Sequence, residues 1–292
     1  MKIAVILVNY NGLNDTLACL ASLEKSVLPI QPIVVDNASK YDEGSSISSK
    51  FPNTIVIKTD INKGFSGGNN IAIKYALENN FDYICLLNND TEVSPNLFEK
   101  MLLKCDENTL IAPLIYYYNK PDIIWSAGGD ILPNKGNVGH KYVNTNKDIT
   151  TDYKCTFATG CCWFAHRKLF KEIGLLNEEY FMYCEDTDYC LRLLQKKKKI
   201  LFVHDAILWH KVSSSSGGEM SPFSVYYMTR NRFYILNKFP DRFTYTALPY
   251  TLFSRIIRIF QYAITGNIVW KSMIKGIYDY YKGVKGKADR IA

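Results

Sequence analysis

Short apolar runs alternate along the first hundred residues with segments whose apolar side chains recur at helical spacing. After Lys2, the run up to Val8 is apolar throughout, as in strands that are buried on both faces of a sheet. Leu13, Leu17 and Leu20 then fall on one face of a helix. This alternation predicts an α/β fold with a doubly wound, mostly parallel central sheet. The strands expected in this part of the chain are residues 2–8, 32–35, 54–58 and 83–87.

The pattern changes after these elements. Glycine and asparagine dominate residues 64–70, which we expect to form a turn ahead of a helix over residues 71–77. Residues 119–154 carry scattered glycine and proline and are expected to form a hairpin or a long loop. The other expected elements are a helix that opens at residues 94–96, a strand over 156–164, a helix over 186–195, strands over 200–203 and 206–209, a serine-rich flexible loop over 213–218, and helices from residue 224 onward.

Polar side chains follow the ends of the predicted strands. Asn9, Asp36 and Asp90 stand at or directly after strand ends, and Asn62 comes a few residues after the third strand. Ligands bind doubly wound sheets at the carboxyl ends of the strands. These positions therefore predict a binding crevice along one edge of the sheet.

Composition bounds the class of protein. The 292 residues are 47% hydrophobic and 22% charged, which suits one large α/β domain with an appendage or two small domains. The net charge is +7, and basic residues concentrate in the C-terminal fifth. This asymmetry indicates a partner with negative charge, which leaves a membrane surface, a phosphate-bearing substrate or a nucleic acid open.

The cysteines and the N-terminus indicate an intracellular protein. None of the eight cysteines forms a C-x-x-C pair, and Cys19 and Cys85 lie in apolar runs, so reduced thiols are expected. The apolar N-terminal run ends at Asn9 without a small-residue cleavage site, which favours a strand over a signal peptide. No apolar stretch has the length needed to span a bilayer. We therefore expect a cytoplasmic location.

Two residues could hold a metal ion. Asp90 ends the polar triplet that follows the apolar run through Leu86, and a carboxylate at a strand end can bind a divalent cation that completes its shell with substrate phosphates. The alternative for Asp90 is a turn carboxylate that caps the helix after it. His210 follows the apolar residues 207–209 and is either an ordinary histidine or the imidazole that completes a one-carboxylate metal site.

Adjacent carboxylates precede the helix expected at 186–195. Glu185 and Asp186 could simply favour the start of that helix through its dipole. They could also supply a general base, because the aromatic residues Tyr180, Phe181 and Tyr183 would desolvate a carboxylate and raise its pKa. The segment by itself leaves both interpretations open.

Other residues indicate a site that binds a nucleotide but not a nicotinamide cofactor. Asp36 ends the second strand, where an acid can bond to a ribose or a base edge. The first turn, however, lacks the G-x-G-x-x-G spacing that admits a pyrophosphate, which argues against a dehydrogenase. Arg230 and Arg232 lie among aromatic residues and could bind a diphosphate, or could belong to a solvated helix face.

Taken in order, these segments resemble family 2 glycosyltransferases, in particular their rhamnosyltransferase-like branch. The resemblance covers roughly residues 1–235, and six short motifs in the family's order carry it. The motifs are Val8-Asn9-Tyr10-Asn11, Val34-Val35-Asp36-Asn37-Ala38-Ser39, Asn62-Lys63-Gly64-Phe65-Ser66-Gly67-Gly68-Asn69-Asn70, Leu87-Asn88-Asn89-Asp90-Thr91, Glu185-Asp186-Thr187-Asp188 and Trp209-His210-Lys211, with Arg230-Asn231-Arg232 as a further likeness.

The resemblance implies a GT-A fold, a nucleoside-diphosphate sugar donor, Mg²⁺ or Mn²⁺, and an inverting mechanism. It implies that Asp90 and His210 hold the metal, that Asp186, beside Glu185, is the base, and that Asp36 contacts the nucleobase or ribose. Asn88 stands where the family usually has its first aspartate. The implied donor-binding residues are Val8, Asn9, Tyr10, Asp36, Asn62, Gly64, Asn69, Asn88, Asn89, Arg230 and Arg232. Many members of this branch transfer L-rhamnose from a dTDP donor, so this donor is expected here.

The C-terminal region, residues 236–292, is expected to be helical, basic and amphipathic beside a catalytic domain of residues 1–235. Phe253, Ile256, Ile257 and Phe260 form one apolar stripe, and a second begins at Trp270. Such helices could lie in a membrane interface, pack on the catalytic domain or pair with a second subunit. A lipid-linked acceptor would make attachment at the inner face of the cell membrane useful.

The expected activity is the transfer of a sugar to a hydroxyl of a cell-surface polysaccharide or a lipid-linked glycan precursor. The alternative is a module that binds a nucleotide sugar or a nucleic acid without catalysis. Interleaved basic and aromatic residues permit RNA binding. The basic residues nevertheless cluster after the candidate catalytic region, and the sequence carries no RNA-binding motif, so no nucleic-acid partner is expected.

Overall fold

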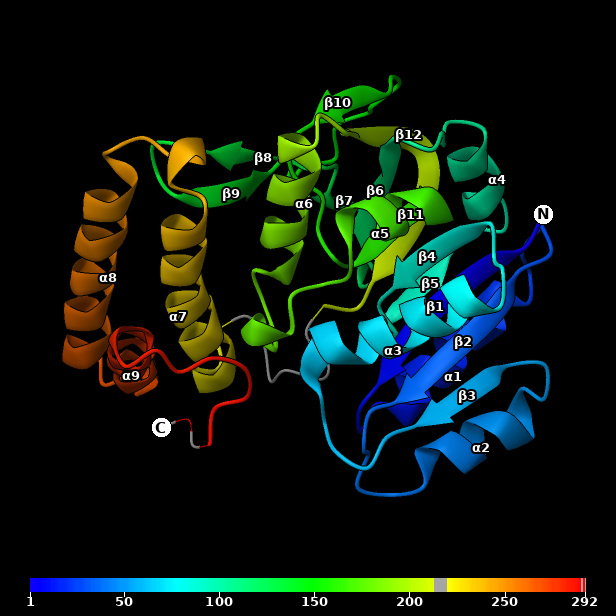
Figure 1. Ribbon diagram of the computed structural model, residues 1–292, viewed down its shortest axis with the longest axis horizontal. Coiled ribbons are helices and arrows are strands. Elements are labelled where there is room, and N and C mark those ends of the chain that lie inside the picture. Colours follow the sequence, from blue (N-terminus) through cyan, green and yellow to red (C-terminus); the bar gives the residue numbers. More distant parts are fainter. Residues whose placement is uncertain (213–219, 290, 292) are drawn as a thin grey trace.

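A mixed central sheet with helices on both faces forms the larger part of the molecule (Figure 1). The computed structural model describes residues 1–212, 220–289 and 291. Among these residues the strand order is β10-β12-β6-β11-β4-β1-β2-β3, with β5 paired to β12 and β7 to β6. The strands are β1 Ile3–Asn9, β2 Gln31–Asp36, β3 Ile55–Lys58, β4 Tyr83–Leu87, β5 Thr91–Val93, β6 Thr109–Tyr117, β7 Lys120–Ser126, β8 Gly129–Leu132, β9 Asn137–His140, β10 Tyr153–Cys155, β11 Cys162–His166 and β12 Lys199–His210.

Helices cover both faces of this sheet. One core cluster joins the face that carries Ile6 to α3, α5 and α6, and another joins the face that carries Leu7 to α1, α2 and α4. The unbroken apolar run of β1 therefore buries alternate side chains in two different layers. The helices are α1 Leu13–Leu23, α2 Glu43–Lys50, α3 Gly64–Glu78, α4 Leu97–Leu102, α5 Arg167–Ile173, α6 Glu185–Gln195, α7 Pro222–Lys238, α8 Ala247–Ile264 and α9 Val269–Tyr281, with short 3-10 turns at Glu178–Tyr180 and Pro240–Arg242.

The sheet topology brings the expected strand ends together. β1 pairs in parallel with β2 and β4, so that Asn9 lies opposite Asp36. β11 then inserts antiparallel between β4 and β6, while β6 and β12 run parallel to each other. The predicted doubly wound, mostly parallel sheet with a helical C-terminal extension is confirmed. The predicted hairpin region contains β7 and the β8–β9 pair.

The turn predicted over residues 64–70 was wrong, because α3 begins at Gly64 and includes the whole glycine-rich segment. Glycine is required there by close packing. A Cβ at Gly68 would lie 2.8 Å from Val8 Cγ1, and one at Gly64, whose φ is +70°, would lie 2.2 Å from the Phe181 carbonyl oxygen. The helix N-terminus thus sits directly against β1 and against the loop before α6.

Two predicted strand boundaries also differ from the structure. β11 begins at Cys162 and not at residue 156, because the chain turns at Gly160, whose amide donates a hydrogen bond to Asp186 Oδ2 over 3.3 Å. The two strands predicted over 200–203 and 206–209 are one strand, β12, with a register irregularity between Val203 and Ile207.

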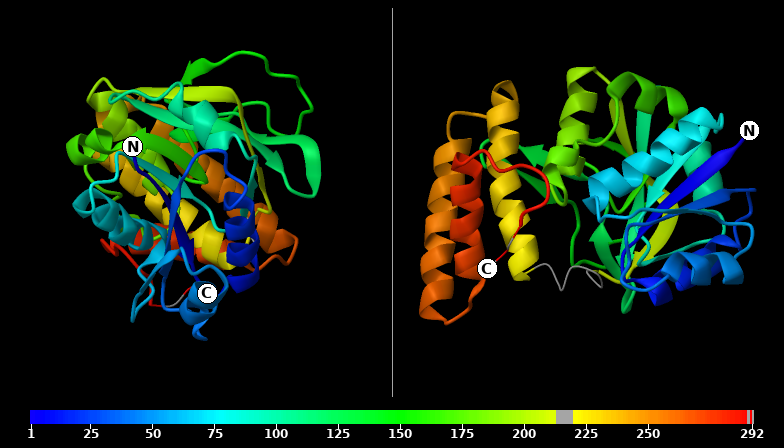
Figure 2. Two further views of the ribbon diagram at one scale, coloured as in Figure 1. Left: turned by 90° about the vertical axis from the view of Figure 1, so that its right-hand side faces the viewer. Right: turned by 60° about the horizontal axis from the view of Figure 1, so that its bottom comes forward.

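Three helices, α7, α8 and α9, lie side by side next to the sheet domain (Figure 2). Gly276 of α9 permits a close crossing, since a Cβ there would lie 2.9 Å from the Tyr226 carbonyl oxygen of α7. The helices expected after residue 224 are confirmed, whereas the serine-rich segment at 213–218 lies outside the described residues. The expected domain boundary at residue 235 falls inside α7. Within the described ranges, no helix has both the length and the apolar character needed to cross a bilayer.

Candidate active site

A cavity of about 1060 Å³ lies between the carboxyl ends of β1 and β4 and the helices α7 and α8. Typical small-molecule sites measure about 300–1,000 Å³. This one can therefore hold a nucleotide sugar together with part of a second substrate. The loop before α6 and the N-terminus of α3 also belong to its wall.

Most of the residues predicted for the site line this cavity. Asn9, Asp36 and Arg230 lie outside its lining. The predicted residues that line it are Val8, Tyr10, Asn62, Gly64, Asn69, Asn88, Asn89, Asp90, Glu185, Asp186, His210 and Arg232.

Asn9 and Asp36 form a buried polar network behind the wall. The Asn9 side-chain amide donates to Asp36 Oδ1 over 3.2 Å and to Glu43 Oε2 over 2.8 Å. Asp36 Oδ2 accepts from the Gly44 amide over 3.1 Å, which ties the end of β2 to α2. In this geometry Asp36 is engaged with protein groups, and its neighbour Asn37 lines the cavity instead.

Asp90 and His210 meet in the cavity wall although 120 residues separate them. His210 Nε2 lies 3.1 Å from Asp90 Oδ1, and both residues are buried. β12 brings them together because its last residue, His210, pairs with Thr91 of β5. The ring of Trp125 packs edge-on against the imidazole at 4.5 Å between centroids.

This pair fits a divalent cation. Two adjacent ligands with bonds of about 2.1 Å at a right angle stand about 3 Å apart, close to the separation observed here. His210 Nδ1 is buried and has no hydrogen-bond partner among the described residues, so it can carry the ring proton when Nε2 offers its lone pair. Asn88 contributes no charge, and the Asn89 amide donates to Thr16 Oγ1 over 2.9 Å.

Glu185 and Asp186 open α6 with two desolvated carboxyl groups. Burial raises the pKa of Asp186, against the opposing effect of hydrogen bonds from the Thr187 amide at 2.6 Å and the Gly160 amide at 3.3 Å. Burial and the neighbouring charge of Asp186 raise the pKa of Glu185 well above its usual range. Glu185 Oε2 has no hydrogen-bond partner among the described residues. Asp186 is the less buried of the two and is partly accessible from the cavity.

The loop before these carboxylates has a strained backbone. Phe181, Tyr183 and Cys184 have φ values of +64°, +64° and +70°, a region that non-glycine residues rarely adopt. Asn231 of α7 holds this loop, since its side-chain amide donates to the carbonyl oxygens of Tyr180, Met182 and Tyr183 over 2.8–2.9 Å. Three such residues thus fall within the four positions that lead directly into Glu185 and Asp186.

Arg230 supports the same loop instead of lining the cavity. Its guanidinium is fully buried and donates to the carbonyl oxygens of Tyr180 and Gly286 over 3.2 Å and 2.9 Å. The predicted contact of Arg230 with the donor therefore has no support in this geometry. Arg232, two residues later, does line the cavity, and its Nε donates to the Gly136 carbonyl oxygen over 2.8 Å.

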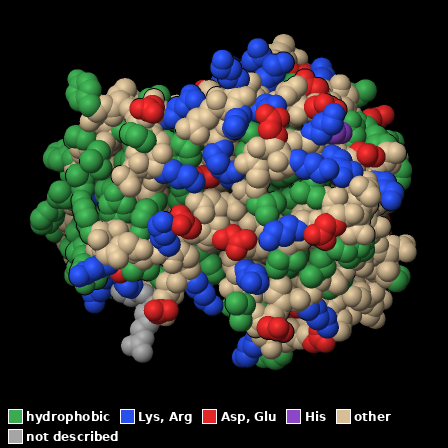
Figure 3. Space-filling view, in the orientation of Figure 1, with side chains coloured by type: hydrophobic (Ala, Val, Ile, Leu, Met, Phe, Trp, Pro, Cys, Tyr) green, Lys and Arg blue, Asp and Glu red, His purple; other side chains and the backbone are tan. Residues whose placement is uncertain are grey.

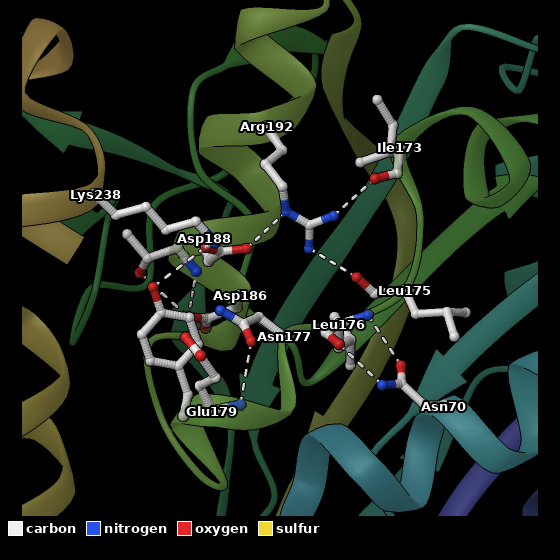
Figure 4. A network of polar contacts seen from close by, with 12 residues as sticks. Asn70, Ile173, Leu175, Leu176, Asn177, Glu179, Asp186, Asp188, Arg192 and Lys238 are labelled. Atoms are coloured by element: carbon white, nitrogen blue, oxygen red, sulfur yellow. Dashed lines mark hydrogen bonds and ion pairs between the residues drawn. The ribbon is translucent and has the colours of Figure 1, made fainter. Parts of the chain in front are cut away.

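Asp188 fixes the far side of α6 (Figure 4). This carboxylate is fully buried and accepts from Arg192 Nε over 2.7 Å and from Lys238 Nζ over 2.5 Å. Arg192 also donates to the carbonyl oxygens of Ile173 and Leu175. Because Lys238 ends α7, this network joins the helix that begins with the carboxylates to the helix that holds their loop.

Several cavity residues were not predicted from the sequence. Trp125 and His140 form an aromatic wall beside His210, and burial lowers the pKa of His140 to about 4. Arg255 and Arg258 of α8 also line the cavity. Nothing in the sequence marked the first two residues, and the two arginines stand between the apolar residues of the stripe that begins at Phe253.

A second group of metal-type side chains lies elsewhere. Asp152, His204 and Asp205 have potential ligand atoms within 4.8 Å of one another, near the irregularity in β12. Lys104 and Lys100 already pair with the two carboxylates, over 2.9 Å and 3.1 Å. None of the three lines the described cavity, so the group does not coincide with the predicted metal site.

Comparison with known proteins identifies the family. The model of "Glycosyl transferase family 2" matches residues 4–174, which is more than half of the chain. The chain belongs to glycosyl transferase family 2. The resemblance seen in the motifs is thereby confirmed, and the chain is a glycosyltransferase by family.

Two characterised relatives of this glycosyltransferase cover most of its length. The low-salt glycan biosynthesis hexosyltransferase Agl10 of Haloferax volcanii is 28% identical over 260 residues, covering 84% of this chain and 80% of that protein. The dTDP-rhamnosyl transferase RfbF of Shigella flexneri is 23% identical over 246 residues, covering 81% of this chain and 80% of that protein.

The fold also has counterparts among solved structures of glycosyltransferases. The crystal structure of GalNAc-T7 with UDP, GalNAc and Mn²⁺ has a TM-score of 0.64 at 18% identity. The match covers 81% of this chain, and this chain spans about half (48%) of that structure. At this identity the likeness shows a common fold, the GT-A arrangement expected from the motifs.

Proposed function

We propose that this glycosyltransferase is a metal-dependent, inverting hexosyltransferase. It transfers a sugar from a nucleoside-diphosphate donor to a hydroxyl of a cell-surface polysaccharide or lipid-linked glycan precursor. The observation that carries the proposal is that Asp90, His210 and Asp186 line one cavity, although they come from three distant parts of the chain.

In the proposed reaction, the acceptor oxygen forms a bond to the anomeric carbon of the donor sugar. The bond from that carbon to the diphosphate oxygen breaks, and its electron pair leaves with the nucleoside diphosphate. Asp186 accepts the proton of the acceptor hydroxyl, a step that is typically worth about 10²–10⁴ in rate. Asp90 and His210 would hold the divalent cation, which would supply positive charge to offset the charge that develops on the leaving group.

The donor-binding part of the cavity is assigned to the residues at the ends of β1 and β4 and at the start of α3. Asn37 connects these residues, because its side chain donates to Asn62 Oδ1 over 3.2 Å and to the Gly64 carbonyl oxygen over 3.0 Å. L-rhamnose on dTDP is the first donor to test, because RfbF, a relative of 23% identity, is a dTDP-rhamnosyl transferase.

Nucleotide sugars added to the protein with Mg²⁺ or Mn²⁺ test this function. The true donor should raise the melting temperature, since a ligand that binds the folded state stabilises it by mass action. The same donor should release nucleoside diphosphate when an acceptor is present, and the new glycosidic bond should have the inverted configuration. Absence of any donor-dependent shift, or retention of configuration, would contradict the proposal. Donor binding without turnover for any acceptor would favour the non-catalytic module.

We also propose that residues 236–292 attach the enzyme to a membrane on its cytoplasmic side. Apolar side chains gather over the helices α8 and α9 (Figure 3). On α8, Phe253, Ile256, Phe260 and Ile264 are 48–85% exposed, which is unusual for such large side chains. A catalytic domain of residues 1–235 remains part of this proposal, with α7 passing through its boundary.

Co-sedimentation with phosphatidylglycerol vesicles tests the attachment. The full chain should sediment with the vesicles, and the double substitution F253S/F260S should reduce the bound fraction. The double substitution Y41S/I61S, which removes exposed apolar side chains from the sheet domain, is the matched control. Equal binding of all three proteins would remove the helices as an anchor, and a change in oligomeric state of F253S/F260S would favour a second subunit.

A further inference from the structure

One side of the cavity carries positive charge without a compensating acid. Arg232, Arg255 and Arg258 line it together, the first from α7 and the other two from α8. The carboxylates among the described lining residues are Asp90, Glu185 and Asp186, and none of them lies within ion-pair distance of these arginines. The charge of this wall is therefore complementary to that of a phosphate group.

Arg255 is the central residue of this wall. Its side chain is buried, with 7% of the residue exposed, and its Nε has no hydrogen-bond partner. It also forms no ion pair with any residue in the part of the chain that the structure describes. Burial and the neighbouring guanidinium groups of Arg232 and Arg258 lower its pKa to about 10, so it stays charged at neutral pH. A buried cation without a partner is costly and calls for an anion.

The helices α7 and α8, which carry the three arginines, lie on the far side of α6 from β1 and β2 (Figure 1). Burial and the charges of Asp186 and Glu185 raise the pKa of the Cys184 thiol, while Arg232 and Arg255 oppose that rise. Cys184 is therefore close to the two carboxylates and to two of the arginines. Since Asp186 receives the proton of the acceptor in the proposed reaction, the arginines lie on the acceptor side of the cavity.

We infer that Arg232, Arg255 and Arg258 bind a phosphate or diphosphate group of the acceptor, which narrows the acceptor to a phosphate-bearing molecule. The inference rests on the proposed transferase function. Guanidinium groups bind phosphate oxygens through paired, charge-assisted hydrogen bonds. A lipid-linked diphosphate suits the same helix, because α8 also exposes Ile256 and Phe260 to the surroundings. A bilayer headgroup is disfavoured as the occupant because Arg255 is recessed in the cavity.

Calorimetric titration with inorganic pyrophosphate in the presence of EDTA tests the site without the metal. R255Q and R258Q should each weaken binding about tenfold, as expected for the loss of one hydrogen-bonding partner of a charged group. R242Q, the same substitution on an arginine outside the cavity, should bind like the wild type. Arg258 is exposed, so R258Q tests the site even if R255Q does not fold. Unchanged pyrophosphate affinity in R258Q, or an equal loss in R242Q, would overturn the inference.

Titration with dTDP and with UDP in the presence of Mn²⁺ separates the acceptor from the donor as the source of the phosphate. R258Q should retain the wild-type affinity for the nucleoside diphosphate if the arginines serve the acceptor. A parallel loss of nucleotide and pyrophosphate affinity would assign the arginines to the donor and overturn the inference. Failure of the wild type to bind any nucleotide would instead reject the proposed function, while the pyrophosphate result would remain interpretable.

Discussion

The side-chain amide of Asn231 lies 2.8 Å from the carbonyl oxygen of Met182 and joins α7 to the strained loop that precedes the two carboxylates. The same amide also contacts the carbonyl oxygens of Tyr180 and Tyr183. Asn231 is fully buried and so acts through the loop, without a place in the cavity lining. Asn231 should therefore affect catalysis by positioning the loop that carries the two carboxylates.

Asn231→Ala should lower kcat while the donor affinity stays near that of the wild type. Misplacement of a catalytic group by about 1 Å can cost about 10²-fold in rate. The lost buried hydrogen bonds should also reduce the free energy of unfolding by about 2–3 kcal/mol. Steady-state kinetics, donor titration and urea unfolding measure the three quantities. Asn79→Ala, at the exposed end of α3, is the control and should leave kcat unchanged. Normal kcat in Asn231→Ala would show that the loop holds its shape without this residue.

Asp186→Asn should abolish transfer but keep donor binding, because the amide cannot accept the proton of the acceptor. In the wild type, kcat should rise with pH on the acid side with an apparent pKa above the ordinary aspartate value of 3.8, since burial raises the pKa of Asp186. A pH–rate profile and a donor titration check both points. Turnover near that of the wild type in Asp186→Asn would remove this residue as the base.

Glu185→Gln should make the stability of the protein less dependent on pH. The folded-state pKa of Glu185 is raised above the ordinary value of 4.5, so its favourable contribution is fully present below pH 4.5 and is lost as pH rises through the folded-state pKa. Each unit of such a shift corresponds to about 1.4 kcal/mol. Urea unfolding at pH 5 and pH 8 should show a smaller loss of stability for Glu185→Gln than for the wild type. An equal loss in both proteins would mean that Glu185 is ionised without cost.

Asp188→Asn should destabilise the fold by about 2 kcal/mol, because it leaves Arg192 and Lys238 without their buried anion. The cost is below that of breaking a fully buried pair because the Lys238 side chain is 40% exposed and stays solvated. Urea unfolding gives the comparison. Asp42→Asn breaks an exposed ion pair with Lys58 and should change stability little. Equal losses of unfolding free energy for the two substitutions would show that the buried network around Asp188 stabilises the fold no more than an exposed ion pair.

His210→Ala should weaken Mn²⁺ binding by about tenfold or more, because it removes a proposed ligand. Loss of a residue that merely supports a ligand already costs about 10–100-fold in metal affinity. Electron paramagnetic resonance of free Mn²⁺ measures the affinity without reference to activity. His204→Ala is a matched control in the Asp152–His204–Asp205 group and should retain the affinity of the wild type. Loss of Mn²⁺ binding in His204→Ala alone would move the metal from the cavity to that group.

The sequence allowed the sheet and most of the cavity to be predicted, since both depend on local pattern. The apolar run that ends at Asn9 could form only a buried strand, and its polar end marked the binding edge. The glycines of α3 were misinterpreted as a turn because their purpose, close approach to Val8 and Phe181, is set by distant segments. Arg255 was missed because its position in the amphipathic pattern of α8 does not reveal whether the arginine is buried or lies on the surface.

Arg230 and Arg232 point to different sides of α7. Residues two apart on a helix point about 200° apart, so Arg230 and Arg232 could not both face one ligand. The structure accordingly places Arg230 against backbone carbonyl oxygens and Arg232 at the cavity. Which of the two faces the cavity depends on how α7 packs, and that packing involves α9, far along the chain.

One helix, α7, contacts the segment from Tyr180 to Asp188 through Arg230, Asn231 and Lys238. Its tilt and the aim of the two carboxylates are therefore mechanically linked and cannot vary independently. Since α8 and α9 pack on α7, and the segment after α9 also bonds to Glu179 through the Gly286 amide, displacement of their outer surface would be transmitted to the reacting groups. Docking of that surface would then tune turnover with no ligand-induced change in the sheet.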